Sequence, residues 1–162
     1  MATLILAADQ ASKTWIVQGL RLPELGSVPV LPVRNLTWGE NRGITFGLLI
    51  GVGSLGPLLL TLVALAVVAA LATWLWRAER GLVAVALGAV AGGAVGNVID
   101  RLRLGYVVDF IHAHAWGWSW YVFNLADAAI VCGVGTLVLE SLIGRPSRPP
   151  GRDRLADAPD HR

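Results

Sequence analysis

Two long stretches without charge constrain the fold of this chain more than any other feature of its sequence. No Asp, Glu, Lys or Arg lies between Arg42 and Arg77, and none lies between Arg80 and Asp100. About 20 apolar residues suffice for a helix to cross ~30 Å of hydrocarbon. Charged residues make up 15% of the chain, whereas soluble domains carry ~25%. The sequence therefore predicts a protein built around membrane-spanning helices.

We expect four spans. The stretch Leu55–Trp76 is uncharged and ends in two tryptophans, which favour the membrane interface. The first span is the least apolar, because it contains Asp9 and Lys13. These two residues are spaced i, i+4, so they share a helix face and can pair, and we expect that face to look into the bundle. The predicted spans cover residues 2–20, 55–76, 81–99 and 121–143.

The third predicted span is rich in small residues. Gly88, Gly92 and Gly96 recur every four residues and so lie on one helix face. In lipid, a face of small residues lets the backbone of a neighbouring helix approach closely. We therefore expect this span to pack directly against another helix.

The distribution of arginine predicts the orientation. Placing the loop "RAER" (77–80) and the tail after Gly144 in the cytoplasm puts seven basic residues inside. The segments 21–54 and 100–120 then lie outside, and turn residues with alternating valines predict short strands in the first. The tail 145–162 is rich in proline and charge, and we expect it to be disordered.

Other broad features exclude several classes. The basic balance (pI near 9.2) reflects topology, so we expect no nucleic-acid partner. The single cysteine, Cys132, excludes an intramolecular disulfide. We expect no cleavable signal peptide, because the N-terminus lacks a basic region.

Two carboxylates, Asp109 and Asp127, sit beside the membrane in an otherwise apolar and aromatic region. Each has an ordinary explanation: Asp109 can pair with Arg101 or Arg103, and Asp127 can follow Asn124 as a cap at a helix start. Taken together, they fall at the same outer end of the bundle. Two carboxylates brought close share one proton and can activate water without a metal. We expect Asp127, near its helix N-terminus, to be the ionised member.

Polar neighbours could complete such a site. Asn97 and Arg101 are spaced i, i+4 at the outer end of their helix, and Asn41 lies in the outer loop. Each is an ordinary turn or cap residue by itself, but together they supply hydrogen-bond donors to a peptide carbonyl. His112 and His114 form an H-x-H that could hold a metal, but no third ligand is evident, so we expect no metal site.

Five sequence blocks resemble those of lipoprotein signal peptidases, the bacterial signal peptidase II family of aspartic peptidases (family A8). They appear in the family's order, from Asp9 to about Gly144, and all five together are highly specific. The blocks are "DQASK" (Asp9–Lys13), "NRGITFG" (Asn41–Gly47), "GGAVGNVIDR" (Gly92–Arg101), "VVDF" (Val107–Phe110) and "FNLAD" (Phe123–Asp127).

The resemblance implies a fold and a membrane location. The fold is an all-α polytopic membrane protein with four transmembrane helices, a small extracytoplasmic β-cradle in 21–49 and a short extracytoplasmic helix in 100–120. Residues 1–144 form one membrane-embedded peptidase domain. The expected location is the bacterial inner membrane, with the active site on the extracytoplasmic side.

The resemblance also implies an activity. The expected enzyme cuts diacylglyceryl-modified prolipoproteins on the N-terminal side of the lipidated cysteine. Asp109 and Asp127 match the family's catalytic pair. The expected partners are these substrates, membrane lipids and the inhibitor globomycin, with no cofactor, and we expect a monomer. The residues expected to line the substrate pocket are Asn41, Asn97, Arg101 and Asn124, and those expected to support the site are Asp9 and Lys13.

Two other classes remain open on the residues alone. A small transporter or receptor could use Asp109 and Asp127 to bind a cation, because intramembrane acids often mark ion paths. The absence of an internal repeat and the position of both acids at one end count against it. A structural membrane subunit without chemistry is the third possibility.

Overall fold

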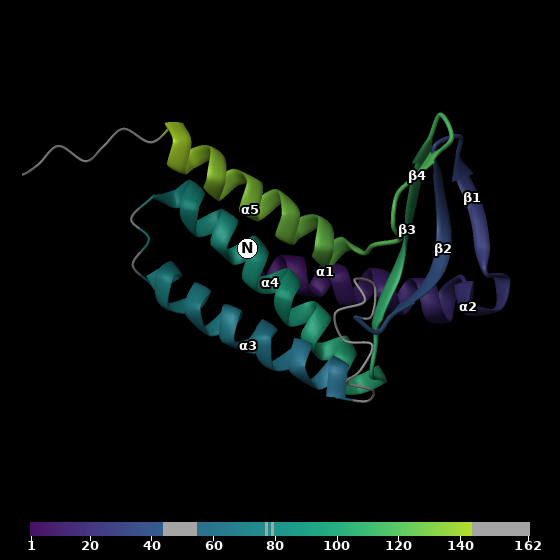
Figure 1. Cartoon of the computed structure of the whole chain (residues 1–162), viewed down its shortest axis with the longest axis horizontal. Coiled ribbons are helices and arrows are strands. Elements are labelled where there is room, and N and C mark those ends of the chain that lie inside the picture. Colours follow the sequence, from purple (N-terminus) through teal and green to yellow (C-terminus); the bar gives the residue numbers. More distant parts are fainter. Residues whose placement is uncertain (44–54, 77, 79, 144–162) are drawn as a thin grey trace, which may run out of the picture.

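The computed structural model describes residues 1–43, 55–76, 78 and 80–143, and it consists of a helical bundle with a β-sheet at one end (Figure 1). Helix α4 lies centrally and packs against three other helices. The helices are α1 (Ala2–Thr14), a π-helical turn η1 (Trp15–Gly19), α2 (Leu22–Leu25), α3 (Leu55–Trp76), α4 (Gly81–Leu104) and α5 (Leu125–Ile143). The predicted positions of all four long apolar segments therefore correspond to helices in the part of the chain that the structure describes.

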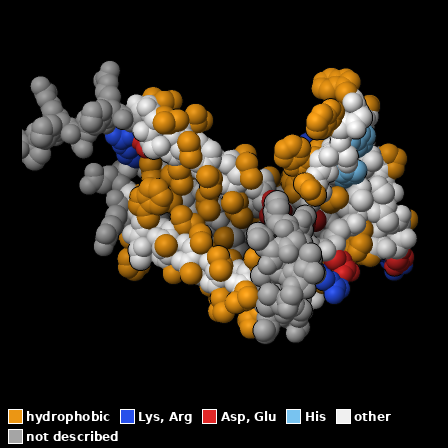
Figure 2. All heavy atoms as spheres, in the orientation of Figure 1, with side chains coloured by type: hydrophobic (Ala, Val, Ile, Leu, Met, Phe, Trp, Pro, Cys, Tyr) orange, Lys and Arg blue, Asp and Glu red, His pale blue; other side chains and the backbone are white. Residues whose placement is uncertain are grey.

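Helix length and composition support part of the membrane prediction. Among the described residues, α4 and α5 are long and apolar enough to cross a membrane, and α3 contains the shorter apolar segment Leu58–Trp74. Hydrophobic side chains cover the bundle face in Figure 2, whereas the visible charges gather at its ends and around the sheet. An exposed ion pair between Arg80 and Glu140 lies at the end opposite the sheet.

The glycine face of α4 packs as predicted. A Cβ atom added to Gly88 would lie 3.3 Å from the backbone nitrogen of Ala2, and one added to Gly92 would overlap the carbonyl oxygen of the same residue. A Cβ on Gly96 would lie 2.5 Å from Oδ2 of Asp9. All three glycines therefore face α1, which approaches α4 too closely to leave room for side chains.

The sheet is antiparallel and has the strand order β1-β2-β3-β4. Its strands are β1 (Ser27–Leu31), β2 (Arg34–Asn41), β3 (Val107–Ala115) and β4 (Trp118–Ser119). Strands in the segment 21–49 were predicted, and β1 and β2 confirm them; residues 44–54 lie outside the described part. The sheet packs on η1 and α2 through a cluster formed by Ile16, Leu22, Val108 and Phe110.

The predicted helix in the outer segment 100–120 is wrong. Helix α4 continues five residues beyond its expected end and stops at Gly105, whose φ of 80° caps it. The chain then forms β3, a two-residue turn and β4. Trp116 and Gly117 both have positive φ (46° and 82°), as a type I′ hairpin turn requires. The helix was expected from the family resemblance alone, and the turn has tryptophan at the position where such turns usually carry Asn or Asp.

The label "all-α" is therefore too narrow. A four-stranded sheet closes one end of the bundle, and its strand β3 comes from the segment that was expected to be helical. The assignment of residues 145–162 as a disordered tail lies outside the described residues.

Candidate active site

Asn124 joins the two candidate catalytic carboxylates. Its side-chain Nδ2 donates to Oδ1 of Asp109 at 2.7 Å. Its Oδ1 accepts from the backbone nitrogen of Asp127 at 2.9 Å, and its own backbone nitrogen donates to Oδ2 of Asp127 at 3.3 Å. The predicted cap at the start of α5 is thereby confirmed. The same residue that begins the helix also holds Asp109, which comes from β3.

Asn97 on α4 completes this arrangement. Its Nδ2 donates to Oδ1 of Asp127 at 2.8 Å, and its Oδ1 accepts from Nδ2 of Asn124 at 3.3 Å and from Nζ of Lys13 at 3.2 Å. An ammonium group can only donate, so the Asn97 oxygen must face Lys13. The amide nitrogen of Asn97 is then left to face Asp127. The charge on Lys13 therefore sets the direction of the hydrogen bonds that reach the carboxylates.

Lys13 itself lies between two buried acids. Its Nζ is 2.9 Å from Oδ2 of Asp9, which confirms the predicted pair, and 2.8 Å from Oδ2 of Asp100. Asp9 also accepts from the backbone nitrogen of Ala126 at 3.1 Å, through Oδ1. Ala126 belongs to α5, so the ion pair between Asp9 and Lys13 on α1 also fixes the position of the first turn of α5, which carries Asp127.

Asp100 and Gln10 are the residues that sequence reasoning missed. Asp100 is 4% exposed and accepts from the backbone nitrogen of Val108 at 3.1 Å and from Nε2 of Gln10 at 3.1 Å. It therefore holds β3 one residue before Asp109. Its position i+3 from Asn97 on α4 was a usable signal, because residues with this spacing share a helix face.

Burial changes the acidity of Asp109. This residue is 4% exposed. Desolvation raises the pKa of Asp109 from its ordinary value to about 6, and the negative charge of Asp127 adds to this effect. Hydrogen bonds from Asn124 and Asn41, and the charge of Lys13, oppose the rise in this pKa. Asp109 thus retains a proton more readily than an ordinary aspartate, which is what a shared-proton pair requires.

Asn41 and Arg101 approach the pair from other sides. Asn41 ends β2 and forms a side-chain hydrogen bond with Asp109, and its Oδ1 accepts from the backbone nitrogen of Gly43 at 2.9 Å. Arg101 is half-buried within electrostatic reach of Asp127 and Asp109. Its Nε atom is buried without a hydrogen-bond partner among the described residues. Within those residues, Asp109 makes no direct ion pair with either Arg101 or Arg103.

The histidine pair lies elsewhere on β3. The rings of His112 and His114 are 5.6 Å apart, and Nε2 of His112 lies 2.7 Å from Oγ of Ser119. The described part of the chain contains no cluster of three or more metal-ligating side chains. The carboxylate network, and not the histidines, is where charged and polar groups converge.

Comparison with known proteins gives one family. The family model described as signal peptidase (SPase) II, Peptidase_A8, matches residues 1–143. A lipoprotein signal peptidase of Methylorubrum extorquens (strain PA1) is 49% identical over 144 residues, covering 89% of this chain and 84% of that protein. A second, from Rhodopseudomonas palustris (strain TIE-1), is 43% identical over 150 residues, covering 90% and 92%.

Solved structures agree with the sequence matches. A bacterial membrane enzyme determined by the in meso method at 1.9 Å resolution superposes with a TM-score of 0.75 and 28% identity, covering 89% of this chain and 91% of that one. The resemblance drawn from five sequence blocks is therefore confirmed at the level of the family. This chain belongs to the signal peptidase II family of aspartic peptidases, whose members are membrane enzymes.

Proposed function

We propose that this protein removes signal peptides from diacylglyceryl-modified prolipoproteins by cutting on the N-terminal side of the lipidated cysteine, with Asp109 and Asp127 as its catalytic pair. Membership of the lipoprotein signal peptidase family supports this substrate class. The observation that carries the assignment of the pair is the hydrogen-bonded network in which Asn124 binds both carboxylates.

Asp127 is the general base in this mechanism. It accepts hydrogen bonds from Nδ2 of Asn97 and the backbone nitrogen of Asn124, and it lies in the first turn of α5, where the helix dipole favours a negative charge. Asp109 is the proton donor, in keeping with its raised pKa.

The chemical steps follow from these states. Asp127 takes a proton from water as the water oxygen attacks the scissile carbonyl carbon, and Asp109 gives its proton to the carbonyl oxygen. The resulting tetrahedral diol then collapses. The C–N bond breaks, the leaving amine receives the proton held by Asp127, and a diol hydroxyl returns a proton to Asp109. Both aspartates end in their starting states.

The surrounding residues divide into three roles. Asn97 and Asn124 are 7% and 0% exposed and bind the carboxylates, so we assign them to orientation of the pair. Arg101 has a buried Nε without a partner among the described residues, and Asn41 stands at the end of β2. We assign these two side chains to hydrogen bonds with substrate carbonyl oxygens. Asp9 and Lys13 support the network from α1.

The proposed location follows from the helices and the charge distribution. Helices α1 with η1, α3, α4 and α5 would form four spans of the bacterial inner membrane, with the sheet outside and 77–80 in the cytoplasm. The substrate, held in the same bilayer by its acyl chains and signal helix, would reach the pair by lateral diffusion. One copy of the chain contains every residue of the pair's network, so a monomer suffices, and residues 145–162 would form a cytoplasmic tail.

A cleavage assay tests the proposal. The purified protein is incubated with a diacylglyceryl-modified prolipoprotein, and release of the signal peptide is followed by gel shift. Asp109→Asn and Asp127→Asn should each abolish the shift, and globomycin should block it. Glu140→Gln is a matched control, because that carboxylate pairs with Arg80 at the far end of the bundle. Cleavage that persists in both aspartate variants would refute the catalytic pair, and cation flux without cleavage would favour a transporter.

A further inference from the structure

A groove at the tip of the sheet lies apart from the carboxylate pair. It has a volume of about 400 Å³ and a mostly apolar lining. Its lining includes Ala113, Ala115, Trp118 and Trp120 from the β3–β4 hairpin. Val33 and Arg34 line it as well. None of these residues takes part in the proposed peptidase mechanism.

The groove continues the sheet face that rests on the helices. Leu36 pairs with Ile111, which lies two residues from Asp109 on β3. Two residues further along the same strands, Arg34 pairs with Ala113. Side chains two apart on a strand share a face, so Ala113 lies on the face of Ile111 and Asp109, which meets Asn124 at the start of α5.

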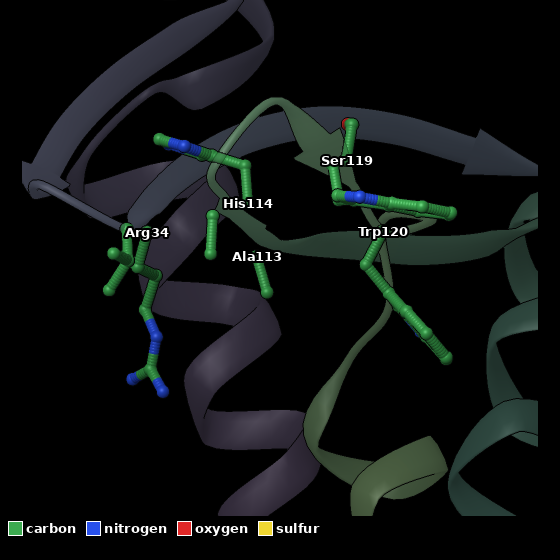
Figure 3. A pocket seen from close by; sticks show the side chains of 8 residues that line it. Arg34, Ala113, His114, Ser119 and Trp120 are labelled. Carbon is green, nitrogen blue, oxygen red and sulfur yellow. The ribbon is translucent and has the colours of Figure 1, made fainter.

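The hairpin adds the tryptophans to the same face. Trp118 pairs with Ala115, and the backbone nitrogen of Trp120 donates to the carbonyl oxygen of Ala113 at 2.9 Å. In Figure 3, the side chains of Arg34, Ala113 and Trp120 project to one side of the sheet, whereas His114 points to the other. The face that meets the start of α5 at Asp109 is therefore uncovered near the hairpin.

The exposed groups in this groove indicate the chemistry of the ligand that would fit it. Trp118 and Trp120 are 84% and 71% exposed, and indole rings favour the depth of lipid headgroups and ester groups. Arg34 makes no side-chain ion pair or hydrogen bond within the described residues, although a guanidinium matches a phosphate with two parallel hydrogen bonds. A molecule with an anionic phosphate, polar esters and an apolar body would satisfy all of these groups.

The place of the groove indicates where such a molecule comes from. The sheet stands at one end of the bundle, and its β3–β4 hairpin extends sideways past the start of α5 (Figure 1). With the helices in a bilayer, as the proposed function requires, the overhanging face looks down on the lipids that surround the bundle. A soluble peptide from the aqueous side could reach this face only by entering the space between the sheet and the bilayer.

We propose that the groove binds a phospholipid of the surrounding bilayer, with Arg34 on its phosphate and Trp118 and Trp120 against its glycerol esters. Strand β3 links this site to the chemistry, because Ala113 is four residues from Asp109, about 13 Å along the strand. A bound lipid thus holds Asp109 at a constant depth in the membrane. The cleaved bond of a lipid-anchored substrate lies at a depth set by its own acyl chains.

Tryptophan fluorescence of the full chain in vesicles tests the contact. Phospholipids brominated in the upper acyl chain should quench the wild-type protein, and the variant Trp118→Phe/Trp120→Phe should lose part of this quenchable emission. Trp38→Phe is the matched control, since Trp38 is half-buried and packs on Tyr106. Trp38→Phe should leave the quenchable emission unchanged. Emission from Trp118 and Trp120 that is quenched by aqueous iodide and not by brominated lipid would overturn the proposal.

Lipid retention tests the headgroup contact. Wild-type protein, Arg34→Gln and the control Arg103→Gln are purified in mild detergent with phosphatidylglycerol, and the lipid bound per protein is measured by native mass spectrometry. Arg34→Gln should weaken retention about tenfold, because a charge-assisted hydrogen bond is lost. Equal retention in all three proteins would overturn the proposal, as would protection of the tryptophans by a soluble peptide. Neither measurement requires cleavage, so failure here leaves the proposed peptidase function standing.

Discussion

At the scale of single residues, the direction of each hydrogen bond around the carboxylate pair follows from one buried charge. Lys13 can only donate, so it turns the oxygen of Asn97 toward itself and the amide nitrogen toward Asp127. Asn124 then donates to both Asn97 and Asp109. An amide is symmetric in shape, and without this cation either orientation would fit the same space.

The raised pKa of Asp109 predicts a pH limit for cleavage. The pKa of about 6 means that Asp109 loses its proton as pH rises through 6, which leaves the pair without a donor. The ratio kcat/KM should therefore fall on the alkaline side with a midpoint near 6. Asn41→Ala removes a hydrogen bond that lowers this pKa, so the midpoint should move to higher pH. A midpoint that stays unchanged or moves lower in Asn41→Ala would contradict this account.

Removing the charge of Lys13 should harm both stability and cleavage. Lys13→Met leaves Asp9 and Asp100 buried without their cation, and breaking a buried ion pair costs about 3–5 kcal/mol. Thermal unfolding in detergent and the cleavage assay should both show the loss. Arg80→Gln is the control, because it removes an exposed pair with Glu140 and should change the midpoint of unfolding little. A Lys13→Met protein that unfolds like wild type would exclude the network described above.

At the scale of elements, α4 packs closely against both α1 and α5, because its glycines leave room for these two helices. Gly96 faces Asp9 on α1, and Gly93 faces the carbonyl oxygen of Ala126 on α5, where an added Cβ would lie 2.6 Å away. These contacts bring both Lys13 on α1 and Asp127 on α5 within hydrogen-bond distance of Asn97. A larger side chain on either face would separate elements that share the site.

This packing predicts different effects for two glycine substitutions. Gly93→Ala should lower the midpoint of thermal unfolding and reduce cleavage, since its new methyl group overlaps a backbone oxygen that cannot move independently. Gly135→Ala on α5 should be neutral or stabilising, because an added Cβ meets nothing within 4 Å and alanine favours helix. Similar unfolding midpoints for the two variants would show that α4 and α5 are less tightly packed than described.

At the scale of the whole molecule, the bundle and the sheet each supply one of the two carboxylates. The helices carry Asp127 and its supports, and the sheet carries Asp109 and the groove at its tip. The two parts meet where Asp100 binds the backbone nitrogen of Val108. The pair therefore forms only when the sheet packs against the end of the bundle where α5 begins.

The proposed orientation predicts which surfaces a membrane-impermeant thiol reagent reaches in intact cells. In a Cys132→Ser background, Glu24→Cys on α2 should be labelled from outside, and Arg80→Cys should be labelled only after the membrane is opened. Both positions are exposed, so access to reagent depends on the side of the membrane. Labelling of Arg80→Cys in intact cells would reverse the proposed topology.

What the sequence determined alone was local or periodic. Long uncharged runs predicted the helices, a four-residue period predicted the glycine face, and the spacing of Asp9 with Lys13 and of Asn124 with Asp127 predicted two contacts that the structure confirms. Each of these rests on residues within one turn or one repeat of each other. The five family blocks likewise identified the family from order and residue type.

The tertiary structure decided how these pieces meet. Gln10 and Asp100 are 90 residues apart, and no spacing rule connects them. The resemblance implied a helix where the chain forms the hairpin over Trp116 and Gly117, and the pairing of β3 with β2 is nonlocal, so no local pattern could correct that expectation. Burial of charge inside the bundle leaves each acid dependent on partners from distant helices, and only the packed fold brings those partners together.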